Sequence, residues 1–141
     1  MHARVVPLFV IFLLFAALTP AQDAKKELEA LQGDWTMVAL EQKGKKFTIS
    51  RFAQSKLTIE GNQWRLGQIE TRTIKIDPSK DPKTIDLTAK KEGIEAISRG
   101  IYKLEDDTLT VCRDTSLTDR PKDFKTTGKA GVLEVWKRAK K

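Results

Sequence analysis

The stretch Gly100–Arg113, GIYKLEDDTLTVCR, decides the fold because it has the pattern of two strands joined by a short turn. Apolar residues alternate with more polar ones on both sides of the acidic pair Asp106-Asp107. The alternating apolar residues are Tyr102 and Leu104 before the turn and Leu109 and Val111 after it. Alternation of period two around a turn is what an antiparallel β-hairpin requires.

The rest of the chain repeats this pattern of short β-rich runs and polar turns. Strands are predicted at residues 34–42, 55–60, 63–67, 70–76, 84–89 and 132–138, and residues 47–52 fit either a short strand or one helical turn. A short helix is predicted over 23–31, with Asp23 as its cap. Residues 90–96 are predicted to be a charged connection, and residues 114–130 a long irregular loop. Eight or nine strands spaced by roughly ten residues predict an all-β antiparallel barrel or sandwich.

The N-terminus has the pattern of a secretory signal peptide. Arg4 precedes a run of apolar residues from Val5 to Leu18, and small residues follow at Thr19-Pro20-Ala21. The run would cover about 21 Å as a helix, which is less than the ~30 Å core of a bilayer. We therefore expect cleavage after Ala21, no stable membrane insertion afterwards, and a single domain over residues 22–141 in the periplasm or outside the cell.

Composition limits the chemistry of this mature domain. The chain's one histidine, His2, lies inside the signal, so the mature domain lacks the commonest general base and metal ligand. Cys112 is the one cysteine, so no internal disulfide can form, and we expect a buried side chain rather than a reactive thiol. Removal of residues 1–21 lowers the net charge from +7 to +6, which favours anionic envelope components as partners over nucleic acid, because no basic helix is present.

Two features near the chain ends resemble the lipocalin signature. Gly33-Asp34-Trp35 is a G-x-W at the entry to the first long strand, and Arg138 lies at the end of the last one. The resemblance implies an eight-stranded up-and-down barrel in which the Trp35 ring closes one end and the Arg138 cation stacks on it. The alternative interpretation is that Trp35 is an ordinary core residue and that Arg138 is solvated.

A closer resemblance covers nearly all of the mature chain. The strings LQGDWTMVALEQKGK, KIDPSKDPKTIDLT, GIYKLEDDTLTVC and RPKDF, in this order, are similar to a secreted planctomycete family of uncharacterised domains. That family has a lipocalin-like pattern and no assigned activity. The resemblance therefore implies a fold and a location and no reaction.

Four aromatic residues are candidates for a ligand site, because aromatic walls with a few polar tips are typical of small-molecule pockets. They are Trp64, Tyr102, Phe124 and Trp136. The alternative is that those on strands fill a collapsed core, which an eight-stranded barrel just allows. Phe124 belongs to the segment Arg120–Phe124, which can contact a partner or tuck against the barrel.

The acidic residues give weaker signals. Asp77, Asp81 and Asp86, or Asp106 and Asp107, lack the spacing of a calcium loop and fit turn positions better. A carboxylate pair for acid–base catalysis can be drawn from Glu41, Glu60 and Glu134, but solvated strand positions are the preferred interpretation. We expect no cofactor and no metal.

These observations favour a non-enzymatic domain that binds a small apolar or amphipathic ligand in its barrel. The alternative is a module that docks its basic surface on an anionic envelope component or on another secreted protein. An enzyme ranks third, since no mature histidine and no nucleophile motif is present.

Overall fold

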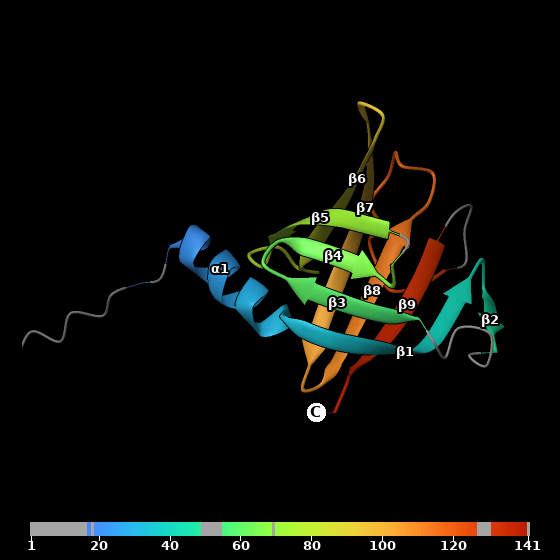
Figure 1. Cartoon of the computed structure of the whole chain (residues 1–141), viewed down its shortest axis with the longest axis horizontal. Coiled ribbons are helices and arrows are strands. Elements are labelled where there is room, and N and C mark those ends of the chain that lie inside the picture. The colour runs from blue at the N-terminus through green and yellow to red at the C-terminus, as the bar shows by residue number, and fades with distance from the viewer. Residues whose placement is uncertain (1–16, 18, 49–54, 69, 127–130, 141) are drawn as a thin grey trace, which may run out of the picture.

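The predicted hairpin around Asp106-Asp107 forms two strands of a closed antiparallel barrel, β7 (Ile94–Glu105) and β8 (Thr108–Asp114), in the computed structural model (Figure 1). The structure describes residues 17, 19–48, 55–68, 70–126 and 131–140. The remaining elements are α1 (Pro20–Leu31), β1 (Gly33–Gln42), β2 (Lys45–Phe47), β3 (Lys56–Glu60), β4 (Gln63–Leu66), β5 (Glu70–Asp77), β6 (Thr84–Lys91) and β9 (Gly131–Arg138). Residues 49–52 of the ambiguous segment lie outside the described residues.

The strand order confirms an up-and-down barrel. Each strand from β3 to β8 pairs with the next one along the chain, and β1 pairs with both β3 and β9. This double pairing closes eight strands into a ring and leaves the three-residue β2 as an addition to the end of β1. The all-β lipocalin-like prediction is therefore correct, and the sandwich alternative is not.

The helix begins earlier than the sequence pattern predicts. Thr19, not Asp23, is the N-cap of α1, and its side chain forms a capping box with Gln22. Pro20 occupies the first helical position, where its missing N–H costs nothing. The expected cleavage point after Ala21 thus falls within the first turn of the helix.

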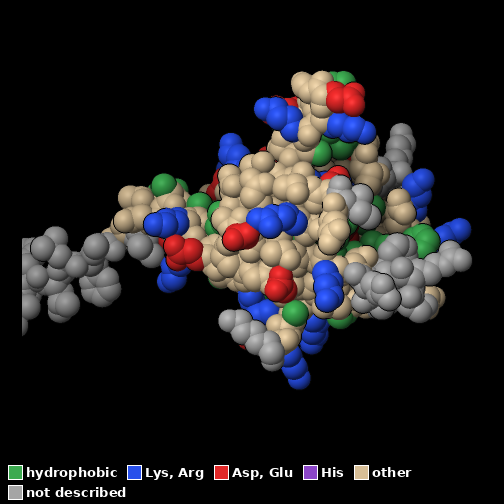
Figure 2. All heavy atoms as spheres, in the orientation of Figure 1, with side chains coloured by type: hydrophobic (Ala, Val, Ile, Leu, Met, Phe, Trp, Pro, Cys, Tyr) green, Lys and Arg blue, Asp and Glu red, His purple; other side chains and the backbone are tan. Residues whose placement is uncertain are grey.

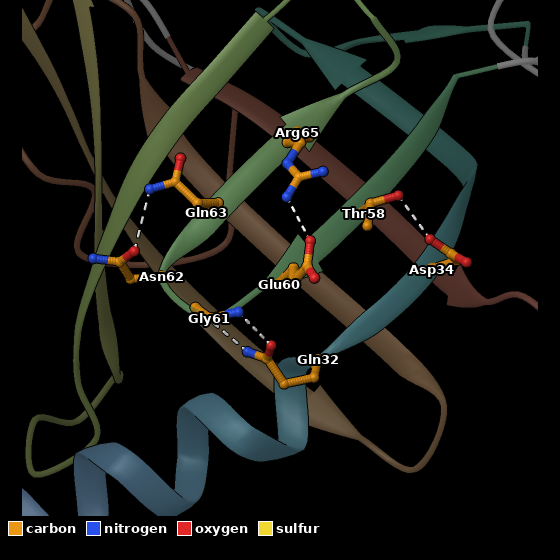
Figure 3. A network of polar contacts seen from close by, with 8 residues as sticks. All are labelled: Gln32, Asp34, Thr58, Glu60, Gly61, Asn62, Gln63 and Arg65. Atoms are coloured by element: carbon orange, nitrogen blue, oxygen red, sulfur yellow. Dashed lines mark hydrogen bonds and ion pairs between the residues drawn. The ribbon is translucent and has the colours of Figure 1, made fainter.

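Polar contacts hold the end of α1 against the β3–β4 turn (Figure 3). The Gln32 amide donates to the Gly61 carbonyl and accepts from the Gly61 N–H, at 2.9 and 2.6 Å. Beside this clamp, Thr58 donates to Asp34 across β1 and β3 at 2.7 Å. The C-terminal end of the helix therefore lies against one end of the barrel, and its N-terminal part projects away from the strands (Figure 1). We call the opposite end, where β6 turns into β7 and β8 ends, the mouth.

Two local features differ from the sequence prediction. Residues 90–96 are not a connection but the tip of a long β6–β7 hairpin, which turns at Glu92 and Gly93 with positive φ angles of 52° and 80°. In β1, the register shifts between Met37 and Ala39. The bulge moves Ala39 to the exposed face and Leu40 to the core, so the alternation that buries Trp35 and Met37 does not continue to Ala39.

The core fills the half of the barrel nearest α1. Side chains alternate between the inside and the outside of each strand, and the inward set is almost wholly apolar in this half. The buried cluster consists of Leu31, Trp35, Met37, Leu57, Ile59, Trp64, Ile74, Ile85, Leu87, Tyr102, Leu109, Val111 and Trp136. Within the described part of the chain, no helix is long and apolar enough to span a membrane.

Candidate binding site in the barrel

Trp35 and Arg138 form the pair that the lipocalin resemblance implies. The Arg138 guanidinium carbon lies 4.2 Å from the Trp35 ring centroid, and the ring is fully buried. Arg138 also donates to the carbonyls of Gln32 and Ala30 at 2.7 and 2.9 Å and to Asp107 at 3.0 Å. Gly33 has a φ of 115°, which favours glycine, and it lies against the Arg138 guanidinium. These contacts hold the C-terminal end of α1 against the end of β9.

Three of the four candidate aromatic residues come together inside the barrel. Trp64 and Trp136 meet edge to face, with ring centroids 6.1 Å apart. Tyr102 belongs to the same buried cluster, but its hydroxyl donates to Glu27 of α1 at 3.3 Å. Burial and the nearby Glu27 carboxylate raise the pKa of Tyr102 well above its usual value. Tyr102 therefore serves the α1 end of the core.

Phe124 lies apart from the other three aromatic residues. Its ring packs under the Lys103 ammonium, 5.5 Å from the ring centroid, and Lys103 points outward from β7. The loop segment that carries Phe124 thus runs along the outside of the barrel.

A buried ion pair lies inside the barrel on the mouth side of Trp136. Glu134 shares the inward face of β9 with Val132 and Trp136, and it is 6% exposed. Arg113 shares the inward face of β8 with Val111, and its Nη2 lies 2.7 Å from Glu134 Oε1. The prediction of a solvated Glu134 is therefore wrong. The buried Glu134 carboxylate requires the Arg113 guanidinium, because a buried carboxylate without a partner is strongly destabilising.

A second ion pair faces inward on the other side of the barrel mouth. Arg72 precedes Ile74 on the inward face of β5 and lies opposite Trp64 in the β4–β5 register. Its Nη2 lies 2.7 Å from Glu70 Oε1, and the two side chains are 18% and 36% exposed. The barrel interior is thus apolar toward α1 and charged toward the mouth.

Two buried donors in this region have no hydrogen-bond partner among the residues that the structure describes. They are Nε of Arg113 and Nε1 of Trp136, on adjacent strands β8 and β9. Both groups can only donate. An unmet buried donor costs about 1–3 kcal/mol, so this part of the barrel favours an acceptor oxygen, supplied by water or by a ligand.

The sequence carried a signal for these charged residues. Glu134 is flanked at two residues' distance by Val132 and Trp136, and Arg113 likewise follows Val111 and Leu109. Period-two alternation places such residues on the inward face. A charged side chain on a strand usually indicates a position that faces solvent, and for this reason the sequence predicts a solvated Glu134.

Five of the other seven acidic candidates have polar partners. Asp77 accepts bonds from the hydroxyl and amide of Ser79, which lower its pKa, as in an Asp-initiated turn. Asp107 pairs with Arg138 and Asp86 with Arg120. Glu60 pairs with Arg65 on the surface, and Glu41 accepts from the Thr126 hydroxyl. Among the described residues, no three His, Cys, Asp or Glu side chains are grouped to hold a metal ion.

Cys112 is fully buried on the outward face of β8, as predicted. Its thiol lies 4.0 Å from the Lys125 carbonyl of the loop that crosses it. Burial, together with nearby acidic residues, raises the pKa of the Cys112 thiol to about 11. The side chain is therefore a neutral packing group at physiological pH.

Comparison of the chain with family models, curated proteins and solved structures yields no match. The residues of the barrel therefore carry the functional argument by themselves.

Proposed function

We propose that this protein is a non-enzymatic binding barrel that takes a small amphipathic ligand at its mouth. The observation that carries the proposal is the Arg113–Glu134 ion pair inside the barrel, in which the buried Nε of Arg113 has no acceptor within the described part of the chain. Replacement of a buried ion pair by apolar side chains is often neutral or stabilising, so stability alone gives little reason to place one here.

The ligand must have both polar and apolar parts. An oxygen of its head group meets the Nε donor of Arg113, and an apolar part contacts Leu40 and the Trp136 ring. Leu40 lies opposite Glu134 in the β1–β9 register, and Trp136 is two residues from Glu134 on the same face of β9. Trp64 and Trp136 already pack against each other deeper in the barrel. A compact ligand therefore suits the site better than a long chain that would have to displace the core.

We also propose that the protein works in the periplasm or outside the cell, as a member of the secreted planctomycete family that its motifs resemble. The apolar run from Val5 to Leu18 supports export.

Native mass spectrometry of the purified protein, after incubation with a lipid and metabolite extract of its source cells, tests the proposal. We expect a discrete added mass that is lost in Arg113→Gln. The matched control is Arg65→Gln, which breaks an Arg–Glu pair on the outside of the barrel and should keep the added mass.

A bare protein mass across all extracts would overturn the proposal, as would equal binding by Arg113→Gln and the native protein. Circular dichroism confirms that each variant is folded. Should Arg113→Gln fail to fold, Trp136→Phe removes the Nε1 donor and keeps an aromatic ring, and we expect it to weaken binding.

A further inference from the structure

A groove of about 670 Å³ lies on the outside of the barrel, separate from the proposed site at the mouth. It runs between the outer faces of β5 and β6 and the loop segment Arg120–Lys122, and we call it the outer groove. Ile101, Pro82 and Pro121 provide apolar surface in it. Its volume falls in the range of ligand sites, about 300–1,000 Å³.

Three lysines on three different segments surround the outer groove. They are Lys75 on β5, Lys80 in the β5–β6 loop and Lys122 beyond β8. All three are exposed, and none has an ion-pair partner among the residues that the structure describes. Figure 2 shows that Lys and Arg side chains are spread over the visible face rather than gathered in one patch. Around the outer groove, the three lysines outnumber Asp77 and Asp81, because Asp86 is paired with Arg120.

Arg120 fixes the wall of the outer groove. Its Nη1 donates to the Gly100 carbonyl at 2.7 Å and to the Ile85 carbonyl at 3.3 Å. Its Nη2 lies 2.7 Å from Asp86 Oδ1, as an ion pair rather than an aligned hydrogen bond. The planar fork of one guanidinium thus ties the loop across β6 and β7, which makes the groove a preformed shape.

We propose that the outer groove binds an acidic peptide segment of another secreted protein. Carboxylates of the segment pair with Lys75, Lys80 and Lys122, and its apolar side chains rest on Ile101 and the two prolines. Asp77 and Asp81 at the same groove repel a misplaced carboxylate, which gives the complex a register.

The lining residues favour a peptide over an anionic glycan. None of the residues that line the groove is aromatic, so among the described residues it offers no flat ring on which a sugar can stack. Its apolar part consists of branched and cyclic aliphatic side chains, which suit Leu or Val side chains between the acids. Apolar contact together with charge pairing is what distinguishes such docking from attraction to any polyanion.

Fluorescence anisotropy with a short labelled peptide of alternating Glu and Leu tests this proposal. We expect binding that weakens as salt rises and that becomes about tenfold weaker or more in a triple Lys→Gln variant at positions 75, 80 and 122. The matched control is a triple Lys→Gln variant at positions 56, 137 and 140, which makes the same charge change at exposed lysines away from the groove.

Arg120→Lys separates shape from charge. It keeps the positive charge but loses the planar fork, so we expect weaker binding at unchanged net charge. Equal loss in the two triple variants, full binding by Arg120→Lys, or tighter binding of a uronate oligosaccharide than of the peptide would each overturn the proposal. Arg113→Gln, which tests the barrel site, should leave peptide binding intact.

Discussion

Gly100 on β7 lies so close to Cys112 on β8 that a Cβ added at Gly100 would stand 2.8 Å from the Cys112 carbonyl oxygen. The same Cβ would lie 3.1 Å from Cβ of Arg113, which faces the interior beside it. Neither neighbour is the free end of a flexible side chain. The missing side chain at position 100 therefore permits both the close strand pairing and the inward placement of Arg113.

Gly100→Ala should lower the free energy of unfolding by about 1–3 kcal/mol, because the added methyl group must displace backbone. Urea denaturation followed by tryptophan fluorescence measures the change. Thr73→Ala, at an exposed position of β5, is the control and should stay within about 0.5 kcal/mol of the native protein. An unchanged midpoint for Gly100→Ala would show that the strands can separate without cost.

Arg138→Lys should destabilise the barrel by about 1–2 kcal/mol. The lysine keeps the charge over Trp35 but cannot bond the Gln32 and Ala30 carbonyls and Asp107 at once. Arg65→Lys, at an exposed pair, should have little effect on the same denaturation midpoint. Similar midpoints for the two variants would reduce Arg138 to an ordinary surface cation.

The double variant with Arg113→Met and Glu134→Leu should be as stable as the native protein or more stable, and it should bind no ligand at the mouth. Apolar side chains avoid the desolvation cost of the ion pair. Glu134→Leu alone should lose on the order of 1–3 kcal/mol, because it leaves Arg113 unpaired at 19% exposure. Thermal melts measure the stability of both variants, and native mass spectrometry measures their ligand binding. Retained binding in the double variant would contradict a role for the pair.

Ionisation of the Cys112 thiol should lower the free energy of unfolding as the pH rises from 9 to 11. The folded protein raises the pKa of the thiol from its ordinary value of 9.0 to about 11, so the folded state holds the proton more tightly than the unfolded state. The resulting stability is complete below pH 9 and is lost as the pH rises toward 11. Urea unfolding across this range should show a shallower decline for Cys112→Ala. Parallel declines would mean that the thiol ionises equally in both states.

Thr19→Ala should leave the stability of the exported protein unchanged, because we expect cleavage after Ala21 to remove the cap. Asp23→Ala should then cost about 0.5–1 kcal/mol, since Asp23 is the first side chain left that can cap the helix. Intact-mass analysis of the exported chain should give Gln22 as the first residue. A stable helix that depends on Thr19 would place the cleavage site elsewhere.

Periodicity predicted the antiparallel strands, and the lipocalin resemblance predicted the closed barrel and its stacked pair. The alternation around Asp106-Asp107 indicated the β7–β8 hairpin, and the G-x-W at Gly33–Trp35 with Arg138 indicated the stacked pair. The hairpin follows from local spacing, whereas the stacked pair is a long-range contact that the lipocalin resemblance implies. The inward face of most strands could also be predicted, because apolar residues at every second position define it.

The bulge, the long hairpin and the charged interior were not predicted, for different physical reasons. The shift at Val38 adds one residue to β1, and nothing in an apolar run marks such an addition. The β6–β7 tip is held by backbone pairing of charged residues, which have no apolar face to reveal them. Arg113 and Glu134 satisfy each other across two strands, and this pairing becomes visible only when the register is known.

The pairing of Trp35 with Arg138 in the β1–β9 register also governs when the domain can form. The first strand of the ring has no partner on one side until the last strand exists, so the ring stays open during synthesis of nearly the whole chain. Closing so large a loop is slow, and the core remains incomplete until the final residues emerge. A chain that cannot fold before its last strand is synthesised stays unfolded until then, and an unfolded polypeptide can pass through a narrow pore.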